Sequence, residues 1–542
     1  MYGDPVYGED FFDREETLSL LERRTVSLKQ GDKRNLAIIG LRKMGKTSIL
    51  LEFKRRITDA DILPVFVYIK PEDVITFAHR FIGGLLYEFI KRRGEEPIED
   101  FDQLLSLCIE YAPRTASSIL RLRQTFETAP KESIFAGALD LPLKLHQETG
   151  ICPIIIFDEF QHFASYRIDS PFHIIRERLF DHKDVMYIVA GSAVSIMGEI
   201  LVSHGSPLYG HFEIINVSSF DYETSKLFLN HRLKGVNVPD IHQNLLVSLT
   251  EGHPYYLDIL SFRIKDISRR EQLRNVPQSV VIEALAQEIF STNGTIYLHL
   301  RDLIDRSLDS RGYTTYIAIL QAVAQGAKTL TGIASVLSKT APEVSRQVRK
   351  LMEIDLLDKF EAVYLLKDPL LRLWLKYVYA AREESFVPEL SLKLQQFKTY
   401  LEQLISSLKS QLGLGNEARI REVFSLFNGE TVSISGRRIT LPKFGEVSSR
   451  IINGEEFDLI AARNGQYWAA EIKSGNINVE DVNRYARKLR KLTLHLEERI
   501  LICLSGIEDQ ALIAAQREKM WVWGLSDVNL LMKLYGRFRI VQ

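Results

Sequence analysis

Residues 36–51 read LAIIGLRKMGKTSILL, and this stretch decides the fold of the first part of the chain. The apolar run at residues 36–39 is typical of a buried parallel strand, residues 40–47 spell G-x-x-x-x-G-K-T, and a helical apolar pattern follows. Gly40 and Gly45 allow a tight loop whose backbone N–H groups point inward, at the positive end of the following helix dipole. The stretch therefore predicts a strand, a phosphate-binding loop and a helix in direct succession.

The residue types in this loop predict a nucleoside triphosphate with Mg²⁺ as the ligand. Lys46 is expected to reach the β- and γ-phosphates, and the hydroxyl of Thr47 is expected to coordinate Mg²⁺. The alternative is a chance match in a loop rich in glycine and lysine, which the strand before it and the helix after it argue against. The predicted nucleotide contacts come from the whole loop, namely Gly40, Leu41, Arg42, Lys43, Met44, Gly45, Lys46, Thr47 and Ser48.

Composition narrows the classes of protein to which the chain can belong. At 542 residues it exceeds what one hydrophobic core supports, so three or four domains are expected. The net charge of -1 means that nucleic acid would have to bind a local basic patch. The three cysteines lack metal-ligand spacing and predict buried thiols in a reducing compartment. Without a secretory signal or an apolar run near ~18 residues, we expect a cytoplasmic protein with no membrane partner.

A second motif, ICPIIIFDEFQHF at residues 151–163, places two carboxylates at the end of an apolar run. Residues 154–157 predict a strand buried on both faces. Asp158 would then lie at the carboxyl edge of a parallel sheet, where α/β folds bind ligands, and would hold Mg²⁺ directly or through water. Glu159 is expected to project toward the γ-phosphate and to act as general base on the attacking water.

Another apolar run, residues 186–191, ends in Ser192. The hydroxyl of Ser192 either orients the lytic water or touches the γ-phosphate, or it caps the helix that follows, and the pattern favours neither. Five expected strands, at 36–40, 63–69, 153–158, 186–191 and 213–217, predict an α/β fold with a parallel-sheet nucleotide-binding core. The helical stretch at about 74–145 is expected to be an insertion or an extended helical layer.

The middle of the chain is helical up to about residue 310, and from there on the pattern combines helices with short strands. In residues 222–309, Gly252 and Pro254 end one helix and begin another. Residues 312–376 predict three helices and a β-hairpin, which is the order of a winged helix. The third helix carries three basic residues, Arg346, Arg349 and Lys350. They either face a DNA duplex or form a solvated face on a module that connects neighbouring domains.

The last part of the chain carries a second constellation, centred on the sequence YWAAEIKS at residues 467–474. Strand alternation places Glu471 and Lys473 on the same face. Asp458 is expected to begin a neighbouring strand and to join Glu471 around one Mg²⁺. Lys473 would activate water or steady negative charge on a phosphodiester under attack, and Glu417 is a candidate outer metal ligand. The alternative is an ordinary surface strand that alternates acid and base.

A helix expected at residues 479–496 carries basic side chains, and we expect this face to hold DNA phosphates: Arg484, Arg487, Lys488, Arg490 and Lys491. The C-terminal segment resembles the PD-(D/E)xK restriction-endonuclease-like fold. The resemblance rests on Asp458, Glu471, Lys473 and Glu417, and Phe457 stands where the motif name has Pro.

The whole chain resembles archaeal-type P-loop ATPases of the STAND and AAA-like group. The resemblance rests on FDREE at 12–16, GLRKMGKTS, IIIFDEFQ, AGSAVSIM, SPLYG and EGHPYYL. It implies that Lys46, Thr47, Asp158 and Glu159 bind and hydrolyse ATP. It also implies that Pro254 and its neighbours link a helical lid to the nucleotide, and that Arg14 lies near the nucleotide rather than on the surface. Relatives often carry an arginine finger where this chain has His211.

The complete prediction is an ATPase that acts on DNA through a metal-dependent nuclease-like domain. The alternative is a signalling or scaffold ATPase whose last domain binds nucleic acid or partners without cleaving. ATP, Mg²⁺, DNA and further copies of the chain are the expected partners. The predicted domains are a P-loop core at 1–218, a helical lid at 219–310, a winged helix at 311–380, a connector at 381–412 and a nuclease-like domain at 413–542.

Overall fold

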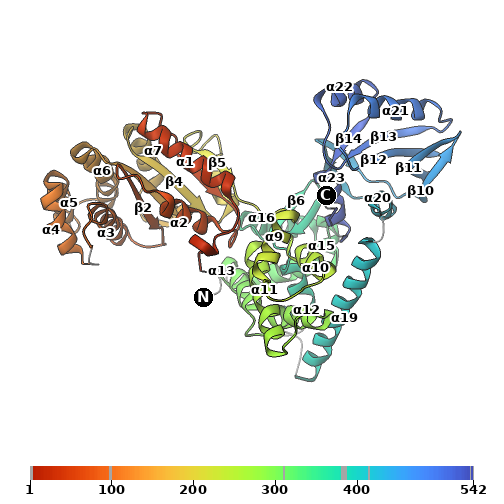
Figure 1. The fold of residues 1–542 in the computed structure, drawn as a ribbon, viewed down its shortest axis with the longest axis horizontal. Helices are drawn as coiled ribbons and strands as arrows, with labels where there is room; N and C mark the ends of the chain where they lie inside the picture. The colour runs from red at the N-terminus through yellow and green to blue at the C-terminus, as the bar shows by residue number, and fades with distance from the viewer. Residues whose placement is uncertain are drawn as a thin grey trace. The chain divides into compact units, whose positions relative to one another are not determined.

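The computed structural model describes residues 4–96, 100–308, 312–379, 387–412, 415–537 and 539–540. The chain divides into two compact units, drawn in Figure 1. The first contains the residues up to Phe220 together with His253–Tyr255 and Glu353–Asp355, and the second contains the rest. The predicted domain borders near residues 310, 380 and 413 lie outside the described residues.

The first unit is built on a five-stranded parallel sheet with the order β2-β3-β4-β1-β5. Each strand lies within one or two residues of its predicted position, so the prediction of a parallel-sheet α/β core is confirmed. Strand β4 lies between β1 and β3, which puts the ends of these three strands next to one another. The strands are β1 Leu36–Ile39, β2 Ile62–Tyr68, β3 Cys152–Asp158, β4 Met186–Gly191 and β5 Glu213–Asn216.

Helices cover both faces of this sheet because its strands are apolar on both sides. In β1, Leu36 and Ile38 pack into the core formed with α1 and α2, whereas Ala37 and Ile39 face the opposite core, formed with α3, α6 and α7. Helices α3 to α6 gather beside the edge strand β2 and form the helical stretch that was predicted as an insertion or an extended helical layer (Figure 1). The helices are α1 Glu15–Lys29, α2 Lys46–Arg56, α3 Val74–Arg92, α4 Phe101–Tyr111, α5 Pro113–Gln124, α6 Lys131–Thr149, α7 Pro171–Asp181 and α8 Val194–Leu201.

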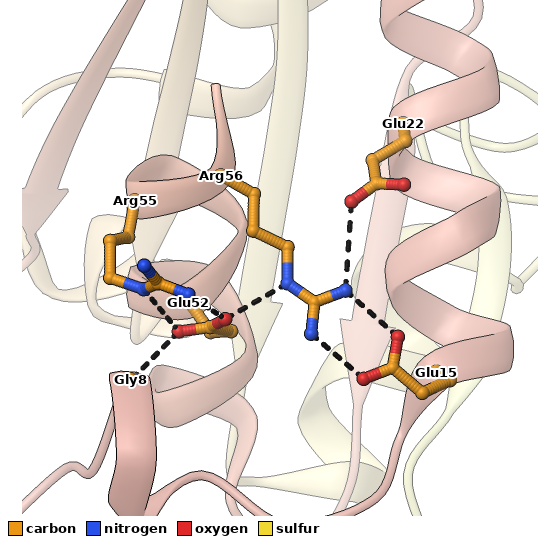
Figure 2. A network of polar contacts seen from close by, with 6 residues as sticks. All are labelled: Gly8, Glu15, Glu22, Glu52, Arg55 and Arg56. Atoms are coloured by element: carbon orange, nitrogen blue, oxygen red, sulfur yellow. Dashed lines mark hydrogen bonds and ion pairs between the residues drawn. The ribbon is translucent and has the colours of Figure 1, made fainter. Parts of the chain in front are cut away.

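Helix α2, which follows the phosphate-binding loop, is fastened by a polar network (Figure 2). The Glu52 carboxylate is buried and accepts hydrogen bonds from Arg55, from Arg56 and from the backbone N–H of Gly8, at 2.8–2.9 Å. These hydrogen bonds lower the pKa of Glu52 to about 2, and the one from Arg55 has the largest effect. Arg56 also donates two 2.8 Å bonds to Glu15 on α1. The network therefore joins α2 to α1 and to the segment that precedes α1.

The second unit begins with helices and a short antiparallel hairpin. Helices α14, α15 and α16 followed by the hairpin β6–β7 have the element order predicted for a winged helix, and Arg346, Arg349 and Lys350 are exposed on α16. The elements are α9 Tyr222–Arg232, α10 Asp240–Thr250, α11 Pro254–Arg270, α12 Gln278–Leu285, α13 Thr295–Ser307, α14 Tyr313–Gln325, α15 Leu330–Val336, α16 Ala341–Glu353, β6 Leu357–Phe360, β7 Val363–Leu366, α17 Leu371–Trp374 and α19 Val387–Leu412.

The C-terminal part contains a five-stranded mixed sheet with the order β10-β11-β12-β13-β14. Strands β10, β11 and β12 are antiparallel, whereas β12, β13 and β14 are parallel. The sheet strands are β10 Glu446–Ile452, β11 Glu455–Arg463, β12 Gln466–Lys473, β13 Leu496–Cys503 and β14 Trp521–Gly524. The remaining elements are α20 Asn416–Ser425, the hairpin strands β8 Thr431–Ile434 and β9 Arg437–Thr440, α21 Val479–Arg490, α22 Asp509–Arg517 and α23 Leu525–Leu534.

The helix predicted at 479–496 is shorter than expected. It ends at Arg490, and Leu496 is already the first residue of β13. Leu492, Leu494 and Leu496 are spaced two residues apart and pack on the same core, which fits an extended chain and not a helix. The predicted boundary was therefore wrong by about one and a half helical turns.

Across the described ranges of the chain, no helix is both long and apolar enough to cross a membrane. The three cysteines are free thiols, and Cys108 and Cys503 are buried. Burial raises the pKa of both thiols to about 12, so they are protonated and unreactive at neutral pH.

Candidate functional site

The loop after β1 has a backbone that requires glycine at two positions. A Cβ atom on Gly40 would lie 2.2 Å from the carbonyl oxygen of Val217, so no larger residue fits against β5 there. Gly45 has φ 93° and Lys43 has φ 61°, both in the left-handed region. The chain turns through these residues directly into α2, so the loop ends at a helix N-terminus, the arrangement that binds phosphate groups.

Lys46 is the buried cation of this loop, with 4% of its surface exposed. Its Nζ donates a 2.7 Å hydrogen bond to the carbonyl oxygen of Leu41 within the same loop. Burial lowers the pKa of Lys46 to about 8, and the charges of Glu159 and Asp158 partly oppose the shift. The ammonium group is therefore held inside the loop, where a phosphate oxygen would be a stronger acceptor than the carbonyl.

Asp158 ends strand β3 and is fully buried. Its Oδ2 accepts a 2.6 Å hydrogen bond from Oγ1 of Thr47, the second residue of α2. Burial, with a smaller contribution from the charge of Glu159, raises the pKa of Asp158 to about 6, against the opposing effects of Thr47 and Lys46. A divalent cation would favour the ionised form of this carboxylate, so the donor set of Thr47 and Asp158 fits the predicted Mg²⁺.

Glu159 and Ser192 are joined at the same edge of the sheet. The Oγ of Ser192, which follows β4, donates a 2.7 Å hydrogen bond to Oε2 of Glu159. The N-cap of α8 is Ala193, and the backbone N–H of Ser195 in the first turn donates to the carboxylate of Asp355. The helix-capping alternative for Ser192 is therefore wrong, because its hydroxyl is used by Glu159.

Gln161 is a residue of this site that the sequence reasoning missed. Its Nε2 donates a 2.5 Å hydrogen bond to Oε2 of Glu159, the same oxygen that Ser192 contacts. The signal available in the sequence was its position two residues after Glu159, in a segment that leaves the sheet edge.

The remaining residues predicted to lie around the nucleotide are spread over neighbouring segments. The guanidinium of Arg14 lies 4.7 Å from the ring centroid of Phe220 and donates a 2.6 Å hydrogen bond to the carbonyl oxygen of Ser218. Pro254 is the first residue of α11 and belongs to the first compact unit. Burial lowers the pKa of the half-buried His211. Contact of Arg14 or Pro254 with a nucleotide stays a prediction.

The second constellation is centred on Glu471 in β12, which is buried. Its Oε1 lies 3.2 Å from Nζ of Lys473, so the two side chains share a face as predicted. Asp458 lies on the adjacent strand β11, where its Oδ2 accepts a 2.7 Å hydrogen bond from the backbone N–H of Ile472. Asp458 is the fourth residue of β11 and does not begin it, because the turn at 453–454, with positive φ at both residues, starts the strand at Glu455.

Lys488 of α21 is a second cation at Glu471. Its Nζ lies 2.9 and 3.1 Å from the two carboxylate oxygens and also donates to the carbonyl oxygen of Glu456. Three more members of the predicted DNA-binding face are paired as well, Arg484 with Asp481, Arg490 with Glu518, and Lys491 with Glu455. The segment therefore does not present the open positive face that was expected, because four of its five cations are paired with carboxylates of the same domain.

Glu417 lies in the first turn of α20. Burial, then the charge of Glu417, raises the pKa of Asp458. Within the part of the chain that the structure describes, no three His, Cys, Asp or Glu side chains are close enough to hold one metal ion. Glu417 does not cluster with Asp458 and Glu471, and its role as an outer metal ligand stays a prediction. Mg²⁺ needs only one or two carboxylates and completes its shell with water, so Asp458 and Glu471 remain a candidate pair.

Comparison with known proteins assigns the first half of the chain. Residues 11–260 match the family described as an ATPase domain predominantly from Archaea. These residues form an archaeal-type ATPase domain. It contains the phosphate-binding loop, both acids at the end of β3, Ser192 and the first residues of α11.

Further proteins are similar to this chain over part of its length. An uncharacterized protein of Methanocaldococcus jannaschii is 23% identical over 352 residues, which cover 62% of this chain and 71% of that protein. A Walker-type ATPase of Pyrococcus abyssi has a TM-score of 0.48 and 21% identity, covering 69% of this chain and 99% of that one. The ORC2 protein of Aeropyrum pernix has a TM-score of 0.43 and 13% identity, covering 72% of this chain and 97% of that one.

The raised pKa of Asp158 predicts that Asp158→Asn stabilises the nucleotide-free protein. The ionised carboxylate is unfavourable in the folded state at pH values above its pKa of about 6, so its removal should raise the free energy of unfolding by ~1–3 kcal/mol near pH 8. The gain should shrink as the pH falls toward ~5, where the folded wild type is already protonated at this site. Urea unfolding at both pH values measures it.

The exposed Asp32 supplies the control, since Asp32→Asn should change the free energy of unfolding by no more than ~0.5 kcal/mol at either pH. A loss of stability in Asp158→Asn near pH 8, or a gain that is the same at both pH values, contradicts the assignment of an ionised, buried carboxylate.

Proposed function

We propose that the chain binds ATP with Mg²⁺ at the loop between β1 and α2 and hydrolyses it. The observation that carries the proposal is the 2.6 Å hydrogen bond between Thr47 and Asp158, which brings the helix after the loop to the end of β3. Lys46 is buried on one side of this contact, and Glu159 follows Asp158 directly in the chain. A cation, a hydroxyl and two carboxylates at one sheet edge are the groups that phosphoryl transfer to water requires.

Each residue has a separate task in this reaction. Lys46 and the backbone N–H groups of the loop bind the phosphates, and Lys46 exchanges the carbonyl of Leu41 for a phosphate oxygen. Thr47 and Asp158 would hold Mg²⁺, which supplies positive charge against the charge that develops on the phosphates. Glu159 accepts the proton of the attacking water, and Ser192 orients the carboxylate that receives it.

Two substitutions in the first unit should separate binding from chemistry. Lys46→Ala is expected to abolish binding of a fluorescent ATP analogue, because the buried cation for the phosphates is lost. Glu159→Gln is expected to bind the analogue as the wild type does while phosphate release falls at least ~100-fold, because the general base is removed. Lys54→Ala, which removes a lysine of α2 outside the loop, is the matched control and should keep wild-type turnover. Normal hydrolysis by Glu159→Gln would refute the assigned role.

We further propose that the C-terminal sheet cleaves DNA phosphodiesters with a divalent metal. The observation that favours this activity is the contact between the buried Glu471 and Lys473, beside an Asp458 whose pKa is raised by burial. Asp458 and Glu471 would hold the metal, and Lys473 would stabilise the developing negative charge or activate the water. The STAND-like signalling or scaffold ATPase, with a last domain that only binds nucleic acid, is the alternative.

Contacts within the second unit support control of this site by ATP. Glu251, at the end of α10, forms ion pairs with Lys533 at 3.1 Å and with Arg539 at 2.7 Å, both near the C-terminus. The hairpin residues Val363 and Leu365 share one hydrophobic core with the C-terminal sheet. Glu251 precedes by two residues the segment His253–Tyr255, which belongs to the ATPase core. A change in that segment on nucleotide binding would therefore act on Glu251 and its partners.

Incubation of the full chain with plasmid DNA tests the cleavage proposal. Mg²⁺ or Mn²⁺ should support nicking, and nicking should vanish in Asp458→Ala and Lys473→Ala because each loses a metal ligand or the catalytic cation. The exposed Asp509 and Lys443 provide matched controls, and Asp509→Ala and Lys443→Ala should cut as the wild type does.

Bound DNA is measured separately from cut DNA, with and without ATP. Equal cutting by the wild type and by both site variants would mark a contaminating nuclease and contradict the proposal. Binding without cutting by the wild type would favour the scaffold alternative.

A further inference from the structure

Glu159 has an unusual backbone conformation for its residue type. Its φ is 55° and its ψ is 45°, in the left-handed region, which a non-glycine residue occupies at a cost of about 1 kcal/mol or more. The turn sends the chain from the end of β3 into a short 3-10 helix, Phe160–Ser165. As a consequence, the side chain of Gln161 returns to the carboxylate of Glu159.

Two donors from different segments meet one oxygen of this carboxylate. Nε2 of Gln161 and Oγ of Ser192 lie 2.5 and 2.7 Å from Oε2 of Glu159. Two directional hydrogen bonds to the same oxygen fix the plane of the carboxyl group, and they leave Oε1 as the oxygen that can accept from water. The orientation of the general base is thus set by both residues together.

The amide of Gln161 is itself held rigidly. Gln161 is 7% exposed, and a Cβ atom on Gly191 would lie 2.7 Å from its Oε1 and 2.4 Å from Sδ of Met197. The carbonyl side of the amide therefore packs against the backbone of β4. Oε1 is buried and has no hydrogen-bond partner within the described chain, which costs about 1–3 kcal/mol. Packing alone does not explain why an amide with an unpaired buried oxygen stands at this position. Its hydrogen bond to the carboxylate of Glu159 does explain it.

We propose that Gln161 is a positioning residue for ATP hydrolysis, which aims the carboxylate of Glu159 at the attacking water through its Nε2–H. This inference rests on the proposed ATPase function and adds a residue to it. Ser192 lies between the phosphate-binding loop and β3, so its hydroxyl can turn from Glu159 to a bound γ-phosphate. Gln161 then remains the donor that keeps Glu159 in place during the reaction, since both residues lie on the same segment after β3.

The experiment compares Gln161→Ala with Gln161→Glu in the full chain. If the N–H donor matters, Gln161→Ala should lower kcat about tenfold and Gln161→Glu about a hundredfold, because the carboxylate keeps the size of the amide but repels Glu159. KM for ATP and the affinity for a fluorescent ATP analogue should stay within about twofold, because neither variant touches the phosphates. If Gln161 only fills space, the loss in Gln161→Ala should not depend on Glu159 and should persist in full in a Glu159→Gln background.

A Gln–Glu pair elsewhere in the chain supplies the matched control. Nε2 of Gln287 donates a 2.9 Å hydrogen bond to Glu283 on α12, and Gln287→Ala and Gln287→Glu should leave kcat unchanged. In a Glu159→Gln background, single-turnover hydrolysis should fall by less than about twofold when Gln161→Ala is added, because Gln161 acts through Glu159.

The outcomes separate the inference from the function on which it rests. Absence of ATP hydrolysis by the wild type overturns the proposed function. Hydrolysis by the wild type with an unchanged kcat in both Gln161 variants overturns only the role of Gln161. A rate loss in Gln161→Ala that exceeds that in Gln161→Glu, or full additivity with Glu159→Gln, also overturns it.

Discussion

The arrangement of the ATPase core depends on one buried contact, the hydrogen bond from Thr47 to Asp158. It joins two segments that are 111 residues apart in the chain, and it exists because β4 brings the ends of β1 and β3 to the same edge of the sheet. Burial of the ionised Asp158 carboxylate costs free energy, and its raised pKa reflects this cost. A bound cation would offset this cost. The same buried carboxylate therefore joins the two segments of the fold and serves the proposed chemistry.

The sequence allowed the ATPase core to be predicted well because its signals are local. Apolar runs marked β1, β2, β3 and β4, since a strand buried on both faces needs a continuous apolar run. Gly40 could be identified as necessary from the motif alone, although the atom that requires it, the carbonyl oxygen of Val217, comes just after β5 and far along the chain. Asp158 followed from the rule that ligands bind at the carboxyl edge of parallel sheets.

The features that could not be predicted depend on which side chains meet across the fold. Gln161 gave only the signal of its position two residues after Glu159, because its contact with that carboxylate arises from the left-handed turn at Glu159. Lys488 was assigned to DNA phosphates, whereas the structure pairs it with Glu471, and charge alone does not reveal such a partner. The predicted start of β11 is wrong because the turn at 453–454 begins the strand at Glu455. The predicted end of α21 is wrong because leucines at every second residue after Arg490 lie on an extended chain.

Calorimetric titration of the full chain with a non-hydrolysable ATP analogue, with and without Mg²⁺, tests the central claim most directly. The claim is that Thr47 and Asp158 together form the metal end of a nucleotide site. It predicts a single nucleotide per chain and an affinity at least about tenfold higher with Mg²⁺, a gain that disappears in Asp158→Asn. An affinity that does not depend on Mg²⁺ in the wild type, or a full Mg²⁺ effect in Asp158→Asn, would contradict the account.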